Sequence, residues 1–238
     1  KEKKDKDSRL KSIQKIDDII QESRAYAQLK ATGSPSFKHD LRLEGMLPVI
    51  SGEIPVFIHA NEVRQIEAAV FWAERQNIKM VLVGGKDSWR VTRLLKDQEI
   101  PVIYTQVHST PRRRFEQYDQ PFITPLQLFE AGIKFCISNS ESTFQTPHIR
   151  NLPYHAAKAA SYGLPWEEAL RSITLSTAEI LGVGHQVGSL ETGKDATLFI
   201  SDGDILDVRA QVTTAFIQGK KVDLSDRHKM LDSKYREK

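Results

Sequence analysis

The sequence predicts an α/β fold made of parallel βα units, followed by a short stretch of antiparallel β-structure. Short apolar segments that suit strands buried on both faces alternate with longer segments whose apolar residues recur at helical spacing. Glycine or proline marks most of the boundaries between them. Beyond Gly182 the alternation stops, and short strand-like segments separated by turn residues follow. These observations predict two kinds of structure in one chain.

Composition places the chain among ordinary globular proteins. Its 238 residues are 39% hydrophobic and 27% charged, which excludes collagen, a disulfide scaffold and a wholly disordered chain. The 34 basic and 31 acidic residues are interleaved and give a net charge of +3, so no nucleic-acid partner is expected. The single Cys136 excludes an internal disulfide and a cysteine-based zinc cluster. No apolar run approaches the roughly 20 residues of a membrane span, so we expect a soluble protein, cytoplasmic or periplasmic, with no membrane partner.

Residues 1–48 are predicted to be leading helices that pack on the domain after them. Residues 1–9 are nearly all charged, and we expect a frayed, solvated start there. Apolar residues recur at helical spacing from Leu10 to Leu29, which predicts one long helix, and turn residues follow it. A shorter helix is predicted over residues 40–50, with Leu41 among its packed residues.

Residues 49–182 are predicted to hold four strands and their helices. The strands are residues 56–60, 80–83, 102–105 and 135–138. Helices are expected over residues 62–76, around Trp89, over 124–132, and over 150–162 and 165–181. Asn61 is a candidate N-cap for the helix over 62–76, and Thr124 with Pro125 has the pattern of a helix start. Either a doubly wound sheet or a barrel fits four such units.

Residues 183–224 are predicted to form a small β-structure, and residues 225–238 a charged tail. Residues 196–200 and 212–217 read as strands, with Gly219 in a turn. This β-structure has no role in a nucleotide-binding domain, and no Gly-x-Gly-x-x-Gly follows the first strand. Both observations speak against a doubly wound nucleotide-binding domain.

The carboxyl ends of parallel strands are where function sits in either architecture. His59 stands at the end of the first strand as a candidate metal ligand, with a hydrogen-bonded structural histidine as the alternative. His108 and Arg150 are candidates for substrate binding, although a loop position is the simpler interpretation of His108. Asn139 follows the fourth strand.

Other residues near the strand ends have simpler interpretations. Residues 112–114 are three arginines that could attract an acidic substrate, but we expect a solvated loop. Asp87 and Glu141 are carboxylates near strand ends that could act as a base. His155 is expected to be a structural helix residue, and Cys136 a core residue.

Several runs of the sequence resemble the C-terminal half of the amidohydrolase superfamily, in its imidazolonepropionase-like and prolidase-like branch. They are residues 58–61 (IHAN), 131–135 (AGIKF), 150–154 (RNLPY), 168–170 (EAL), 174–182 (TLSTAEILG) and 188–196 (GSLETGKDA). The resemblance extends over about residues 40–223 and is most specific between residues 174 and 196.

The resemblance implies an eight-stranded (β/α) barrel with a small β-domain built from both ends of the chain. The four predicted strands would be barrel strands five to eight, and residues 183–224 the C-terminal part of the β-domain. Because a complete barrel needs about 250 residues, the chain would be the second half of one. We therefore expect the N-terminal half of the barrel as its partner, from the same protein or from another chain of an oligomer, since an unclosed barrel leaves strand edges unpaired.

The family's chemistry, hydrolysis at a divalent metal such as zinc, is also implied by the resemblance. His59 stands where the family has a metal-binding histidine on strand five. Gly84 stands at the histidine position of strand six, and Asn139 at the position of the aspartate that serves as ligand and general base. An asparagine cannot accept a proton at neutral pH, although its oxygen could still bind a metal or substrate. The resemblance therefore implies a reduced metal site.

Two functions follow from the resemblance and its departures. One is a metal-dependent hydrolase that acts on a C–N bond of a small-molecule amide, cyclic amide or peptide. The alternative is a catalytically silent subunit that serves as a binding or scaffold partner of a catalytic chain.

Overall fold

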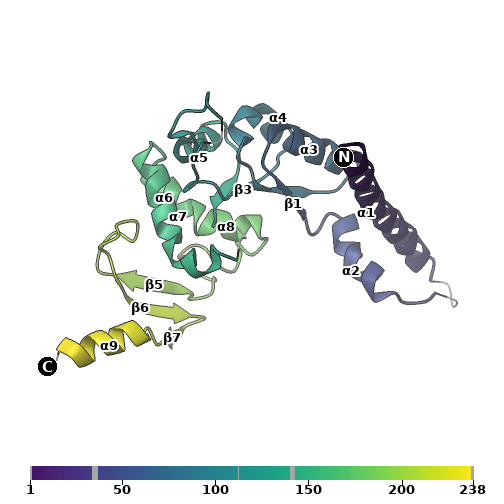
Figure 1. The fold of residues 1–238 in the computed structure, drawn as a ribbon. Coiled ribbons are helices and arrows are strands. Elements are labelled where there is room, and N and C mark those ends of the chain that lie inside the picture. Colours follow the sequence, from purple (N-terminus) through teal and green to yellow (C-terminus); the bar gives the residue numbers. More distant parts are fainter. Residues whose placement is uncertain (1, 34–36, 112, 140–142, 237–238) are drawn as a thin grey trace. The chain divides into compact units, whose positions relative to one another are not determined.

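A computed structural model describes residues 2–33, 37–111, 113–139 and 143–236 of the chain. It shows a mixed α/β fold with a parallel sheet and a small antiparallel sheet (Figure 1). The chain divides into two compact units. One comprises residues 1–57 with 71–80, and the other comprises residues 58–70 with 81–238.

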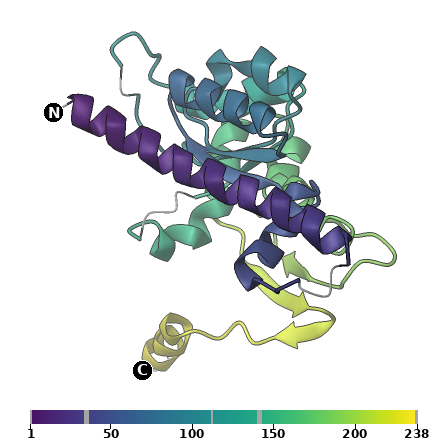
Figure 2. The same cartoon turned by 90° about the vertical axis from the view of Figure 1, so that its right-hand side faces the viewer.

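The first unit is built on α1 (Glu2–Ala31), the long purple helix in Figure 2, which packs against α2 (Leu41–Ile50). The Tyr26 hydroxyl donates a 2.7 Å hydrogen bond to the Glu44 carboxylate, which also pairs with Lys30. Nearer the start of α1, the Asp17 carboxylate accepts hydrogen bonds from Trp72 Nε1 at 2.8 Å and Gln76 Nε2 at 2.9 Å. Polar contacts therefore hold α1 at two places, to α2 and to residues 72–76.

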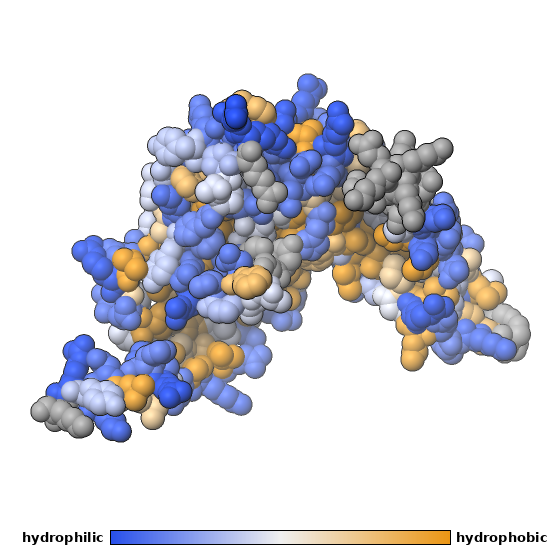
Figure 3. All heavy atoms as spheres, in the orientation of Figure 1, coloured by the Kyte–Doolittle hydropathy of each residue, from blue (hydrophilic) through white to orange (hydrophobic). Residues whose placement is uncertain are grey.

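The sequence prediction for this unit needs two corrections. The first charged residues are helical from Glu2 onward, because lysine and glutamate are good helix formers and extend a helix that is nucleated further along. The apolar stripe of α1 is only partly used, because Ile20 and Tyr26 are buried whereas Leu10 is 56% exposed, and Leu41, which was predicted to pack within the second helix, is 86% exposed. Figure 3 shows hydrophobic residues in orange among the hydrophilic residues on the face that it presents.

The parallel sheet has the strand order β1-β2-β3-β4. Its strands are β1 (Val56–Ala60), β2 (Met80–Gly84), β3 (Val102–Tyr104) and β4 (Phe135–Ile137). Leu82 pairs with Val102, which pairs with Phe135. Every residue of β2 and β4 is buried, as predicted for apolar strands covered on both faces. The prediction fails for β1, in which Phe57 and His59 are exposed.

Helices alternate with these strands. They are α3 (Val63–Arg75), the 3₁₀ turn η1 (Ser88–Arg90), α4 (Thr92–Asp97), α5 (Gln120–Glu130), η2 (Thr146–Asn151), α6 (Leu152–Ser161), α7 (Trp166–Ser172) and α8 (Leu175–Ile180). The predicted start at Thr124 is wrong, because α5 begins one turn earlier and the Thr124 hydroxyl donates to the Gln120 carbonyl. The single helix predicted over 165–181 is divided at Thr174, where φ and ψ are −127° and −95°.

Beyond α8 the chain forms a small antiparallel sheet of β5 (Leu198–Ser201), β6 (Val212–Ile217) and β7 (Lys220–Val222). Gln218 and Gly219 both have positive φ in the tight turn between β6 and β7, as a two-residue hairpin requires. The charged tail contains a helix, α9 (Arg227–Arg236), whose first backbone amides are capped by Asp226. None of the described helices is both long and apolar enough to cross a membrane.

Candidate functional site at the strand ends

Asn61 ties together the carboxyl ends of β1 and β2. Its side-chain Oδ1 accepts a 3.3 Å hydrogen bond from the backbone amide of Lys86, and its carbonyl accepts one of 2.8 Å from the amide of Asp87. The backbone N–H of Asn61 donates a hydrogen bond to Gln65 Oε1 at 3.1 Å. Asn61 is therefore not the predicted helix cap. Asp87 Oδ2 instead accepts from the amide of Val63 at the start of α3, at 3.2 Å.

Asp87 is also the centre of a buried ion-pair cluster. It is 1% exposed, and both of its carboxylate oxygens are hydrogen-bonded by Arg113, at 2.7 and 2.8 Å. Arg113 Nη1 also donates to Glu116 at 2.8 Å, and Lys86 Nζ lies 4.0 Å from the same carboxylate. Burial opposes ionisation of Asp87, but the hydrogen bonds from Arg113 and Val63 outweigh it, so that the pKa of Asp87 is lowered.

The cluster corrects two expectations from the sequence. Arg113 is not a solvated loop residue, because a buried carboxylate such as Asp87 needs a paired cation. Arg114 is exposed, as expected, while Arg112 and Glu141 lie outside the described residues. Asp87 is committed to Arg113 and is poorly placed to act as a base.

Two histidines stack beyond the end of β3. His108 in the following loop and His155 on α6 have ring centroids 4.0 Å apart and ring planes inclined at 21°. Burial, and then the neighbouring His108, lowers the pKa of His155 to about 4. Burial and Lys158 also lower the pKa of His108, against a hydrogen bond from its ring to the Tyr154 carbonyl. Both imidazoles are therefore neutral at pH 7.

Asn139 follows β4 and offers an unused acceptor. Its Nδ2 donates to the His148 carbonyl at 3.0 Å, while its buried Oδ1 has no hydrogen-bond partner within the described parts of the chain. The same holds for the buried Nδ1 of His155. Arg150 is exposed in η2, and His59 is exposed on β1. The structure thus pairs His108 with His155, a partner that the sequence had suggested only as a structural residue.

The stacked pair predicts a loss of stability in mild acid. The pKa of His155 is about 4 in the folded protein against about 6.5 in the unfolded chain. The unfolded chain therefore binds the proton first, and the free energy of unfolding should fall by about 2 kcal/mol between pH 8 and pH 5. In urea titrations, the unfolding free energy of His155→Phe, which keeps a stacking ring, should not show this fall between pH 8 and pH 5. The exposed control His228→Phe should show it as wild type does. An equal fall in wild type and His155→Phe would contradict the expectation.

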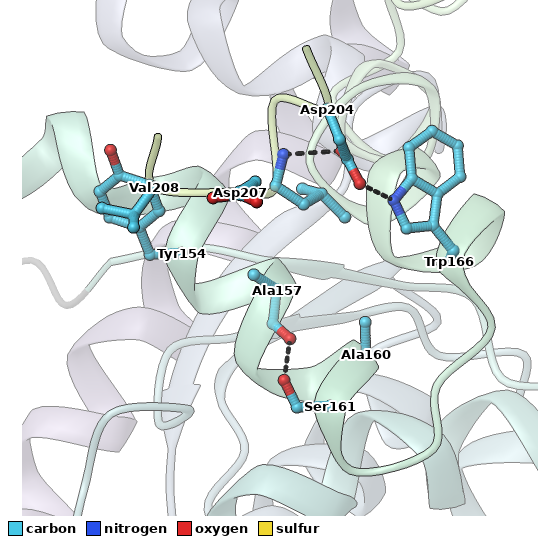
Figure 4. Close-up of a pocket in the computed structure, with 9 residues that line it drawn as sticks. Tyr154, Ala157, Ala160, Ser161, Trp166, Asp204, Asp207 and Val208 are labelled. Atoms are coloured by element: carbon cyan, nitrogen blue, oxygen red, sulfur yellow. Dashed lines mark hydrogen bonds between the residues drawn. The ribbon is translucent and has the colours of Figure 1, made fainter. Parts of the chain in front are cut away.

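A pocket of about 600 Å³ opens beside α6 and is drawn in Figure 4. Trp166 Nε1 donates to Asp204 at 2.8 Å, and the other oxygen of Asp204 accepts from the Leu206 amide at 2.9 Å. Leu206 is buried and anchors the loop between β5 and β6. These hydrogen bonds hold the loop against Trp166 at the start of α7, and both lie in the wall of the pocket.

Comparison with known proteins identifies the family to which part of this chain is similar. A model of the amidohydrolase family matches residues 133–222. These residues are an amidohydrolase family domain. The resemblance to the imidazolonepropionase-like and prolidase-like branch of the superfamily is thereby confirmed, and prolidases occur among the solved structures that share the fold.

Three similar proteins show how far the likeness extends. Amidohydrolase tasK of Hapsidospora irregularis is 41% identical over 92 residues, covering 39% of this chain and 9% of that protein. Imidazolonepropionase of Brucella anthropi is 25% identical over 150 residues, covering 63% of this chain and 35% of that protein. The structure of an amidohydrolase from Thermotoga maritima is 27% identical with a TM-score of 0.76, and the match covers 87% of this chain and 54% of that one. The chain therefore spans about half of this solved relative and less of the curated ones.

The family's metal is tested by the residues around the strand ends. Within the described ranges, no three histidine, cysteine, aspartate or glutamate side chains are grouped so that they could hold a metal ion. The described part of this amidohydrolase domain and its βα units thus does not form a complete metal site by itself. Sequence reasoning also missed the roles of Asn61 and Arg113. The sequence signal for the role of Asn61 was the Gly84-Gly85 pair at the end of the next strand. Because glycine has no side chain, this pair leaves space that the side chain of a residue on a neighbouring strand end can fill.

Proposed function

We propose that the chain is part of a metal-dependent hydrolase that acts on the C–N bond of an amide, a cyclic amide or a peptide in a small molecule. The observation that carries this proposal is the amidohydrolase family domain at residues 133–222, which continues directly from parallel βα units. Relatives named as hydrolases support the hydrolase over the silent-subunit alternative.

In this proposal, β1 to β4 are strands five to eight of a (β/α) barrel. The four strands form one sheet in sequence order, as neighbouring strands of such a barrel do. The Thermotoga maritima structure supports this arrangement, since the match covers only 54% of that chain and leaves room for further strands. The N-terminal half of the barrel, in the same protein or in another chain, would supply the remaining strands.

The metal site of the assembled protein would be a reduced one. Members of the superfamily are generally metal-dependent, and zinc is our candidate. His59 would contribute one ligand from β1, and the N-terminal half would supply the others. A bound metal of this kind lowers the pKa of a water ligand and polarises the substrate.

The other strand ends would bind and orient the substrate. The Asn139 amide cannot serve as a general base, but its buried Oδ1 can accept a hydrogen bond from a substrate N–H. His108 is neutral at pH 7, so its ring can contact a substrate without placing a charge beside the reacting group. Arg150, exposed on η2, can pair with a substrate carboxylate.

The activity is tested on the full-length protein with three substrate groups: simple N-acyl amino acids, cyclic amides such as imidazolones, and Xaa-Pro dipeptides. We expect hydrolysis within one group, loss of turnover after removal of the metal with a chelator, and recovery when zinc is added back. Absence of hydrolysis in all three groups by zinc-loaded protein would contradict the proposal and favour the silent subunit.

A further inference from the structure

At the end of β2, the backbone at Gly84 has a conformation that favours glycine, and the side chain of Asn61 fills the space that a side chain at position 84 would need. Gly84 has φ of +96°, in the left-handed region that residues with a Cβ rarely adopt. A Cβ on Gly84 would lie 2.7 Å from Asn61 Oδ1, 3.1 Å from Asn61 Cγ and 3.2 Å from Asn61 Nδ2. All three distances are to the side-chain amide of Asn61, so this amide occupies the position where a residue-84 side chain would begin.

The backbone of Asn61 is fixed by hydrogen bonds from its N–H to Gln65 and from the Asp87 amide to its carbonyl, at 3.1 and 2.8 Å. Its side-chain amide cannot turn away from Gly84 without losing the hydrogen bond that the Lys86 amide donates to Oδ1. The amide of Gly85 also donates to the carbonyl of Ala60 at 2.9 Å. The two strand ends are thus joined directly by hydrogen bonds between protein groups.

We infer that the Asn61 amide closes the end of β2, so that a metal ion held by the assembled protein takes no ligand from β2 and none from Asn61. Restoring a histidine at position 84 would meet both the positive φ and the Asn61 amide. The absence of a ligand at position 84 therefore involves the conformation of the whole strand end, and a single substitution at this position would not restore the ligand. The inference rests on the contacts of Asn61 and Gly84, and it holds whether or not the proposed hydrolase activity is found.

A pair of glycine substitutions in the full chain separates the steric contact from backbone strain. Gly193 has φ of +95° and no atom within 4 Å of an added Cβ, so Gly193→Ala imposes the same strain without the clash. We expect Gly84→Ala to lower the urea midpoint clearly more than Gly193→Ala does. In an Asn61→Ala background, the effect of the Gly84 substitution should shrink to that of Gly193→Ala.

Equal shifts for Gly84→Ala and Gly193→Ala would overturn the inference, because the Asn61 amide would then not occupy the space. This comparison remains decisive if the Asn61→Ala protein does not fold. Zinc content, measured by elemental analysis of the full-length protein after dialysis against zinc, supplies the second readout. Asn61→Ala should retain its bound zinc, since loss of a residue that only supports a ligand weakens binding roughly 10- to 100-fold at most. A loss of zinc as complete as that of His59→Ala would identify Asn61 as a ligand and overturn the inference. Wild-type protein without zinc would count against the proposed function, while the glycine comparison would still decide the closure of β2.

Discussion

Replacing Arg113 with methionine should destabilise the protein by about 3 to 5 kcal/mol, the usual cost of removing one partner from a buried ion pair. Asp87 and Glu116 have side chains only 1% and 3% exposed, and the substitution leaves both carboxylates without their closest cation. Methionine keeps much of the apolar contact of the arginine side chain, so the loss of stability measures the contribution of the positive charge. Urea or thermal unfolding of the full chain measures it.

A surface pair of the same chemistry supplies the matched control. Arg209 pairs with Asp207 at 2.6 Å, but its side chain is 87% exposed, so Arg209→Met should destabilise the protein far less than Arg113→Met does. A loss for Arg113→Met no larger than for Arg209→Met would show that the Asp87 cluster does not hold the strand ends together.

The pH dependence of the same variant checks the cause. The folded pKa of Asp87 is lowered, so its contribution is present above the unfolded pKa of about 3.9 and disappears as the pH falls through the folded value. The difference in unfolding free energy between wild type and Arg113→Met should therefore narrow in strong acid. A difference that is constant down to pH 2 would point to lost packing instead.

The strands and the order of elements could be predicted because they depend on local pattern. The apolar run from Met80 to Val83 lies between turn residues, and burial on both faces of a parallel sheet requires this pattern. After Gly182 the alternation of strands and helices gives way to short apolar segments separated by turn residues, which likewise predicted the small antiparallel sheet.

The polar connections at the strand ends could not be predicted from local pattern. Arg113 lies 26 residues from Asp87 in the sequence, and an arginine in a run of three gives no sign of which one is buried. Asn61 matched a helix cap by position, but Asp87 caps the helix after it. The pairing of His108 with His155 depends on how α6 packs, which apolar periodicity does not determine.

We propose that this chain contributes His59 to the metal site of the assembled hydrolase. Loss of a metal ligand should weaken binding more than the roughly 10- to 100-fold typical of losing a residue that only supports a ligand. The direct measurement is the zinc affinity of the full-length protein, determined by competition with a chelator, for wild type, His59→Ala and His228→Ala. The exposed His228 on α9 is the control. We predict a large loss of affinity for His59→Ala alone, and zinc binding unchanged by His59→Ala would contradict the account.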